Sequence, residues 1–250
     1  MKQADRTYPG IAAALPAIRW DSSDPVRLVN LAHAYHYLLH PDDRDLLQMV
    51  YLPIDHENLL SLLFDQKRFL AGGNFNEDEL ARIARGETSP YPYWASFLHA
   101  FQHARWSFAE ADRLLHTDYL AWLIQGPSPL LSAWARLSVQ LRLSTWSQED
   151  LPAWLHPDRE QLTSLVGEEW PPLPEELNRT LRDTDLWARE QAIDRWLWDH
   201  LEQTIQFDPF SIDALVSYAL RTFLASRWSA FQVTPGEQRL HHLITTITSN

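Results

Sequence analysis

Eleven histidines are the first residues in this sequence that could do chemistry. Two pairs, His36 with His40 and His99 with His103, have a four-residue spacing that places both imidazoles on one face of a helix. Zinc proteases use such a pair with a glutamate directly after the first histidine, and neither pair has that glutamate. The histidines therefore predict ordinary surface or half-buried side chains, and we expect no metal and no cofactor.

Adjacent acids are the second candidates, because general acid–base catalysis needs two carboxylates that converge on a cleft. The pairs Asp42-Asp43, Glu168-Glu169 and Glu175-Glu176 lie beside prolines at expected helix starts. Negative charge there interacts favourably with the helix dipole, and neighbouring residues on a helix point apart. These acids predict helix starts and no catalytic pair.

The usual signatures of nucleophilic and nucleotide-dependent enzymes are absent. The chain has no cysteine, which excludes disulfides and thiolate chemistry. It contains no Gly-x-Ser-x-Gly, no phosphate-binding Gly-x-x-x-x-Gly-Lys and no Gly-x-Gly-x-x-Gly. The sequence thus predicts a protein that is not an enzyme, with a metal-dependent hydrolase as a remote alternative.

The composition predicts what kind of elements position these residues. Leucine occurs 39 times against 10 isoleucines and 7 valines, whereas strands favour β-branched residues. Only 7 of the 250 residues are glycine, which hairpin turns need. We expect an all-α protein of short antiparallel helical bundles, organised as one domain over residues 1–250.

Prolines and helix caps divide the chain into roughly ten expected helices. After an extended lead-in over residues 8–16, a helix is expected over residues 25–39, and a second from Pro41 with an interruption at Pro53. Asn76 and Glu79 form a capping-box pattern for a short helix that closes at Gly86. Helical patterns follow over residues 93–125, broken near Ser107, and over residues 129–145.

The remainder is predicted to contain a loop and then the strongest helical patterns. Residues 147–174 have four prolines from Pro157 onward and predict a linker or surface loop. Helices are expected over residues 184–206 and 211–228, with a last one from Pro235. Leucine-rich runs in Leu52–Leu63, Ala135–Trp146 and Phe210–Leu220 hint at internal triplication.

The charge of the chain restricts its partners and its location. The net charge is −12, and acids are spread over both halves, so nucleic acid is not an expected partner. No apolar run is long enough to span a membrane, and the N-terminus does not have the pattern of a signal peptide. We therefore expect a cytoplasmic protein.

Twelve tryptophans suggest a surface for another protein, because interfaces are enriched in tryptophan and arginine. Core packing explains most of them, and Trp187, Trp198 and Trp228 are the candidates to face a partner. Within the helix expected over residues 184–206, Arg189, Glu190 and Asp194 lie on a mixed-charge face. That face is either simply solvated or a docking surface.

Both halves carry an ordered set of residues. The C-terminal half has Arg189-Glu190, Ile193-Asp194, Trp196, Leu201, Phe207, Phe210, Tyr218, Arg227-Trp228 and Gly236. The N-terminal half has Leu15-Pro16, Asp55, Asn58-Leu59-Leu60, Leu63, Gly73-Asn74, and Pro92-Tyr93 before Phe97. In order and spacing, these residues resemble an uncharacterised branch of a bacterial family, the C-like subunits of V/A-type ATPases. In eukaryotic naming these subunits are called d-like. Residues 147–174 match nothing in that family.

The resemblance implies a non-catalytic central-stalk subunit. Such a protein is a funnel of three similar helical bundles that couples the rotor shaft to the membrane proteolipid ring. The partners would be the shaft and the ring of this ATPase, and the protein would lie at the inner membrane through the complex. The residues expected at a partner interface are Asp55, Asn58, Trp187, Arg189, Glu190, Asp194, Trp198, Arg227 and Trp228. A stand-alone helical adaptor that shares the fold is the alternative.

Overall fold

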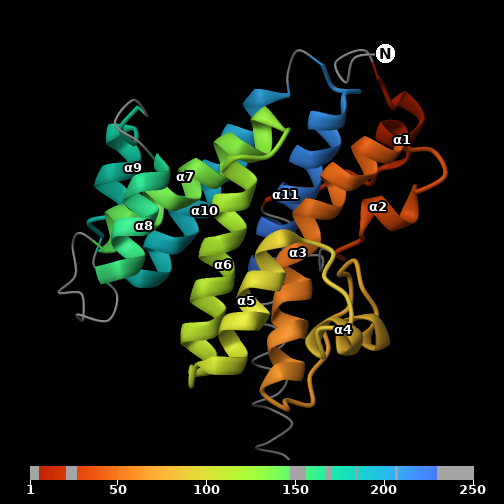
Figure 1. Ribbon diagram of the computed structural model, residues 1–250. Helices are drawn as coiled ribbons and strands as arrows, with labels where there is room; N and C mark the ends of the chain where they lie inside the picture. Colours follow the sequence, from red (N-terminus) through yellow and green to blue (C-terminus); the bar gives the residue numbers. More distant parts are fainter. Residues whose placement is uncertain are drawn as a thin grey trace, which may run out of the picture. The chain divides into compact units, whose positions relative to one another are not determined.

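The computed structural model describes residues 6–20, 27–146, 156–166, 171–183, 185–205 and 208–229. These ranges form eleven α-helices and no strand apart from an isolated antiparallel bridge between Thr7 and Ser211, which confirms the all-α class (Figure 1). The helices are α1 (Pro9–Ala14), α2 (Leu31–Ala34), α3 (Pro41–Leu63), α4 (Glu77–Ala84), α5 (Pro92–His103), α6 (Phe108–Ile124), α7 (Pro129–Trp146), α8 (His156–Val166), α9 (Glu175–Thr180), α10 (Leu186–Thr204) and α11 (Ile212–Ser229). Within the described ranges, none of them has both the length and the apolar character needed to cross a bilayer.

The contacts within the chain divide it into two compact units, and the expected single domain over residues 1–250 stays a prediction. Unit 1 comprises residues 1–50 and 194–250, and unit 2 comprises residues 51–193. The boundaries fall inside α3, between Val50 and Tyr51, and inside α10, between Ile193 and Asp194. Composition did not reveal this division, because it separates parts of the same helices and not segments joined by a linker.

Helix α6 is the centre of unit 2, where it packs against α5, α7 and α8. Figure 1 shows α5 and α6 side by side near the centre of the view, with α8 and α9 to their left. Leu115 and Leu123 on α6 are fully buried, as is Leu131 on α7. The break expected near Ser107 is the start of α6, where Ser107 and Glu110 form a capping box.

In unit 1 the N-terminal segment is fixed at two points. The Tyr8 backbone N–H donates to the Phe210 carbonyl at 2.7 Å. Its hydroxyl donates to the buried carboxylate of Asp43, which also pairs with Arg6 Nε at 3.2 Å. Burial raises the pKa of Tyr8 to about 12. The segment expected to be extended instead forms the short helix α1, which has a proline at its first turn, where proline is tolerated.

Two predicted helix boundaries are wrong. The helix expected over residues 25–39 is present only as the four-residue α2, capped by the Asn30 side chain; residues 24–26 lie outside the described ranges. Tyr35, His36 and Tyr37 are weak helix formers, and α2 ends at Ala34 with Tyr35 as its C-cap. By contrast, α3 continues through Pro53, because the buried residues on both sides of it pack well enough to offset the lost hydrogen bond.

The loop predicted over residues 147–174 contains a helix. Helix α8 covers residues 156–166, while residues 147–155 and 167–170 lie outside the described part of the chain. Pro157 occupies the first turn of α8, where its missing N–H has no intrahelical acceptor to lose. The proline that suggested a loop therefore begins a helix. The helix expected from Pro235 also lies outside the described residues.

Candidate functional site

The nine residues predicted at a partner interface fall into three places. Asp55 and Asn58 lie on the part of α3 that belongs to unit 2. Trp187, Arg189 and Glu190 lie on the first turns of α10, also in unit 2. The others, which are Asp194, Trp198, Arg227 and Trp228, come together in unit 1.

Asp55 fixes the loop that precedes α4. Its side chain is fully buried, and its carboxylate accepts hydrogen bonds from the Asn74 backbone N–H at 2.8 Å, the Asn74 side-chain amide at 2.8 Å and the Phe75 backbone N–H at 3.2 Å. Burial raises the pKa of Asp55 to about 6, although these hydrogen bonds act in the opposite direction. Gly73 allows this approach, because its position leaves no room for a Cβ beside the carboxylate.

Asn58 fixes the same loop one helical turn later. Its side-chain amide donates to the Leu70 carbonyl at 2.8 Å, and its side-chain oxygen accepts from the Leu70 N–H at 2.6 Å. The side chain thus pairs with the backbone of one residue as a neighbouring strand would. Since Asn58 is buried, both polar residues on this part of α3 position a loop from inside unit 2.

Between Asp55 and Asn58, His56 lies in an aromatic cluster that the sequence did not single out. A hydrogen bond of 2.8 Å joins its Nε2 to the Tyr93 hydroxyl, and its ring packs 5.2 Å from the Tyr119 ring and 5.6 Å from the Trp94 ring. Among the described residues, its Nδ1 has no hydrogen-bond partner. Burial lowers the pKa of His56 well below its ordinary value, so this imidazole is neutral.

The neutral state of His56 gives a prediction for stability against pH. A buried histidine with a lowered pKa binds fewer protons in the folded than in the unfolded chain, so its stabilising contribution is complete above about pH 6.5 and is lost as the pH falls. His116, whose pKa burial lowers to about 4, acts in the same direction, whereas the raised pKa of Asp55 acts against them between about pH 4 and pH 6.

His56→Phe is therefore expected to lower the free energy of unfolding by about 1–2 kcal/mol at neutral pH, because the Tyr93 hydroxyl loses its partner. It is also expected to lessen the loss of stability between about pH 7 and about pH 5. Urea unfolding at both pH values measures the two effects. An unchanged pH dependence in the variant would show that His56 does not contribute to it.

The first turns of α10 carry the predicted residues that are most accessible. Trp187 is 52% exposed, and the neighbouring Leu186 is 61% exposed. The Asp185 carboxylate accepts from the Trp187 N–H at 2.9 Å and from the Ala188 N–H at 3.1 Å, so this helix start is well capped. Arg189 and Glu190 are half-buried. We call Leu186 and Trp187 the α10 apolar pair.

The four predicted residues in unit 1 form one connected group. Asp194 Oδ2 accepts hydrogen bonds from Arg227 Nη1 at 2.9 Å and from Trp228 Nε1 at 2.8 Å. Trp20 lies against both Trp198 and Trp228, with ring centres 5.9 and 6.3 Å apart. The sequence did not single out Trp20, although the dipeptide Arg19-Trp20 has the same pattern as Arg227-Trp228.

Burial separates the predicted interface residues into two kinds. Five of them are buried and in this conformation are not available to contact a partner directly: Asp55, Asn58, Asp194, Trp198 and Trp228. The α10 apolar pair and, in part, the side chains of Arg189, Glu190 and Arg227 reach the surface. Sequence alone did not distinguish the two kinds, because a tryptophan beside an arginine fits either.

Two hollows are relevant to the hydrolase alternative. A cavity of about 270 Å³ in unit 1 is lined mainly by apolar side chains, with Tyr218 and Arg221. A groove of about 390 Å³ in unit 2 is lined by residues including Glu87, Ser89 and His99. Glu87 pairs with Arg85 at 2.6 Å, and the Ser89 hydroxyl donates to the Tyr91 carbonyl. Within the described ranges, no three metal-ligating side chains of His, Asp or Glu lie together.

Comparison with known proteins gives one match. A family described as "Protein of unknown function (DUF2764)" matches residues 166–250, about a third of the chain. The matched segment includes α9, α10 and α11 and therefore all the residues that carry the C-terminal half of the resemblance described above. No curated protein and no solved structure matches the chain significantly.

Proposed function

We propose that this protein is a non-catalytic central-stalk subunit of a V/A-type ATPase and that it couples the rotor shaft to the membrane proteolipid ring. The observation that carries the proposal is the ordered resemblance to the C-like subunits of these ATPases, from Leu15-Pro16 to Gly236. The all-α fold agrees with what that resemblance implies. The protein would then lie at the inner membrane through its partners.

The residues of the resemblance include several that hold the fold together. Asp55 with Gly73-Asn74 fixes the loop before α4, and Asp194 with Arg227-Trp228 joins α10 to α11 in unit 1. These contacts give structural roles to residues on which the resemblance rests, so those residues need not touch a partner.

The α10 apolar pair is the proposed point of contact with the rest of the ATPase. Large exposed apolar side chains beside a partly exposed arginine have the composition of an interface centre. The net charge of −12 would favour a basic partner such as a positively charged shaft, chiefly by increasing the association rate.

An affinity purification from gently solubilised membranes of the protein's own host tests the proposal. Mass spectrometry is expected to recover the catalytic ATPase subunits and the proteolipid with the tagged chain. Recovery of the chain alone from a host that assembles such an ATPase would contradict the proposal. Recovery with other proteins but without ATPase subunits would favour the adaptor alternative.

A matched pair of variants tests whether the α10 apolar pair is the contact, separately from whether the protein is a stalk subunit. Trp187→Asp is expected to lower the recovery of ATPase subunits by about 10-fold or more, because interface tryptophans often contribute over 1.4 kcal/mol to binding. Tyr37→Asp, at another exposed aromatic residue, is the control and is expected to leave recovery unchanged. Full recovery with both variants would reject the α10 apolar pair as the contact but leave the proposed function intact.

A further inference from the structure

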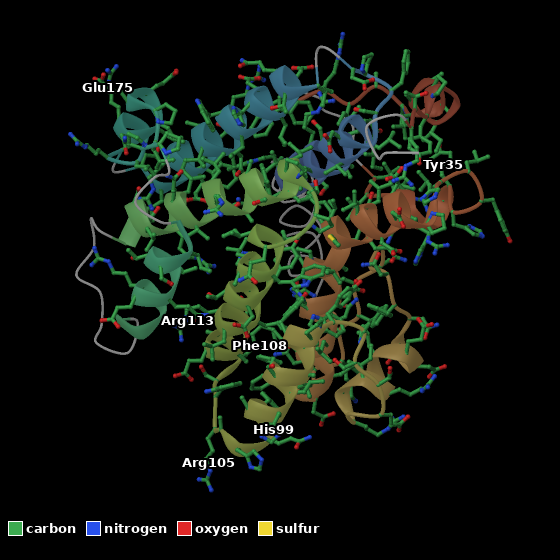
Figure 2. All side chains as sticks on the ribbon, turned by 45° about the horizontal axis from the view of Figure 1, so that its top comes forward. Tyr35, His99, Arg105, Phe108, Arg113 and Glu175 are labelled. Carbon is green, nitrogen blue, oxygen red and sulfur yellow. The ribbon has the colours of Figure 1, made fainter. Side chains whose placement is uncertain are left out.

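Helix α5 presents two histidines that form no polar interaction with the described part of the chain. His99 and His103 are both exposed, and Figure 2 shows His99 on α5 at the lower edge of the view. The helix carries no lysine, arginine, aspartate or glutamate from Pro92 to His103. Among the described residues, neither imidazole has a hydrogen bond or an ion pair, and the one aromatic ring that each packs against is the other imidazole.

The two rings lie edge to face, with an angle of 74° between their planes, and their separation is compatible with a shared metal ion. Their centres are 5.1 Å apart. A metal–nitrogen bond is about 2.1 Å long, and the ring centre lies about 1.2 Å from the nitrogen, so each ring centre would be about 3.3 Å from the ion. For bond angles between 90° and 109° at the metal, the two ring centres would then be roughly 4.7–5.4 Å apart. We propose that His99 and His103 chelate one divalent transition-metal ion on the surface of α5, independently of the stalk function proposed above.

The donor set determines which ions fit. Imidazole suits Cu²⁺, Ni²⁺ and Zn²⁺, and Cu²⁺ binds most tightly in the general order for such ligands, whereas Mg²⁺ and Ca²⁺ prefer oxygen. With two protein ligands, the other coordination positions are taken by water or by a donor from a bound molecule. The groove of about 390 Å³ beside His99 leaves space for them. Glu87 in that groove is engaged by Arg82 and Arg85.

The second histidine pair of the same spacing shows why the helix matters. His36 and His40 lie between α2 and α3 and not on a helix. The centres of the His36 and Tyr37 rings are 3.5 Å apart, and their planes are tilted by 42°. His40 Nδ1 accepts a hydrogen bond from the Asp42 N–H at 3.3 Å. Spacing alone predicted equal roles for the two pairs, and the structure distinguishes them. The missing glutamate of zinc proteases is irrelevant here, because chelation needs no general base.

Titration of the full chain, without a polyhistidine tag, tests this site. Isothermal titration calorimetry with NiCl₂ and ZnCl₂ is expected to show one more ion bound by the wild type than by the His99→Ala/His103→Ala double variant. Either single substitution is expected to lower the affinity for that ion by about 10-fold or more, because the protein then supplies one imidazole and the gain from a second ligand in the same molecule is lost. Both side chains are exposed, so circular dichroism is expected to show unchanged folding.

Two further variants make the test decisive. His36→Ala/His40→Ala is the matched control and is expected to retain the ion. Adding Gln102→His to His103→Ala is expected to restore binding, because residues three apart also share a helix face. Electron paramagnetic resonance of bound Cu²⁺ is expected to show two nitrogen ligands in the wild type. Equal binding by the wild type and the double variant up to about 1 mM metal, or loss in the control variant only, would overturn the proposal.

Discussion

Gly73→Ala is expected to lower the free energy of unfolding by about 2–4 kcal/mol, a large effect for one added methyl group. A Cβ at this position would lie 2.2 Å from Asp55 Oδ1 and 3.0 Å from Asp55 Cγ. The carboxylate cannot yield easily, because it is buried and accepts hydrogen bonds from Asn74 and Phe75. The added methyl group must therefore displace the loop that the carboxylate holds.

Urea unfolding followed by tryptophan fluorescence measures this cost. Gly10→Ala is the matched control, since a Cβ there meets no atom within 4 Å, and it is expected to change stability by less than about 1 kcal/mol. In an Asp55→Ala background, Gly73→Ala is expected to cost less, because the clash is with the removed carboxylate. Equal effects of the two glycine substitutions would contradict the geometry described for the loop.

Asp194→Ala is expected to destabilise the protein by about 2–4 kcal/mol. The substitution removes the acceptor of the Trp228 indole N–H, which lies in a buried side chain. The Arg227 side chain is 46% exposed, so its ion pair with Asp194 contributes the smaller part. Most of the cost comes from the buried donor left without its acceptor.

The same helix provides the control. Asp199 pairs with Arg195 at 3.2 Å on the exposed side of α10, and Asp199→Ala is expected to cost at most about 0.5 kcal/mol. The stability cost of Asp194→Asn is expected to lie between the costs of Asp194→Ala and Asp199→Ala, because an amide oxygen still accepts a hydrogen bond. If Asp194→Ala cost no more than Asp199→Ala in denaturant unfolding, Asp194 would be a surface residue as the sequence suggested.

The burial of Asp194 also changes how a charged docking face can be tested. The sequence placed Glu190 and Asp194 on one face, so that reversing both charges would probe a basic partner. Since Asp194 is 4% exposed, reversing its charge would disrupt unit 1. A loss of partner binding in that variant would therefore say nothing about the interface, and Trp187 is the better position to change.

Capping and turn patterns in the sequence correctly predicted several helix starts and ends. The capping box of Asn76 and Glu79, the helix end at Gly86 and the break at Ser107 are present as expected, because each depends on residues a few positions apart. The continuation of α3 through Pro53 was not predictable in this way. Whether a helix continues through a proline depends on how the whole helix packs, and a short stretch of sequence does not determine that packing.

The sequence identified candidate interface residues, which stay a prediction, but it could not show which of them are buried. The pairing of Asp194 with Arg227 and Trp228 spans more than thirty positions along the chain, so helical periodicity could not reveal it. Likewise, the contrast between His99/His103 and His36/His40 follows from where helices end. Residue type and spacing identify candidates, and the tertiary structure decides whether a side chain is buried, paired or able to bind.

The most direct test of the proposed stalk function measures ATP hydrolysis and ion transport together in membrane vesicles from the protein's own host. In vesicles from a deletion strain, hydrolysis by the catalytic subunits is expected to lose its coupling to ion transport, and the wild-type chain supplied in trans is expected to restore the number of ions moved per ATP. An unchanged ratio of transported ions to hydrolysed ATP in the deletion strain would contradict a coupling function.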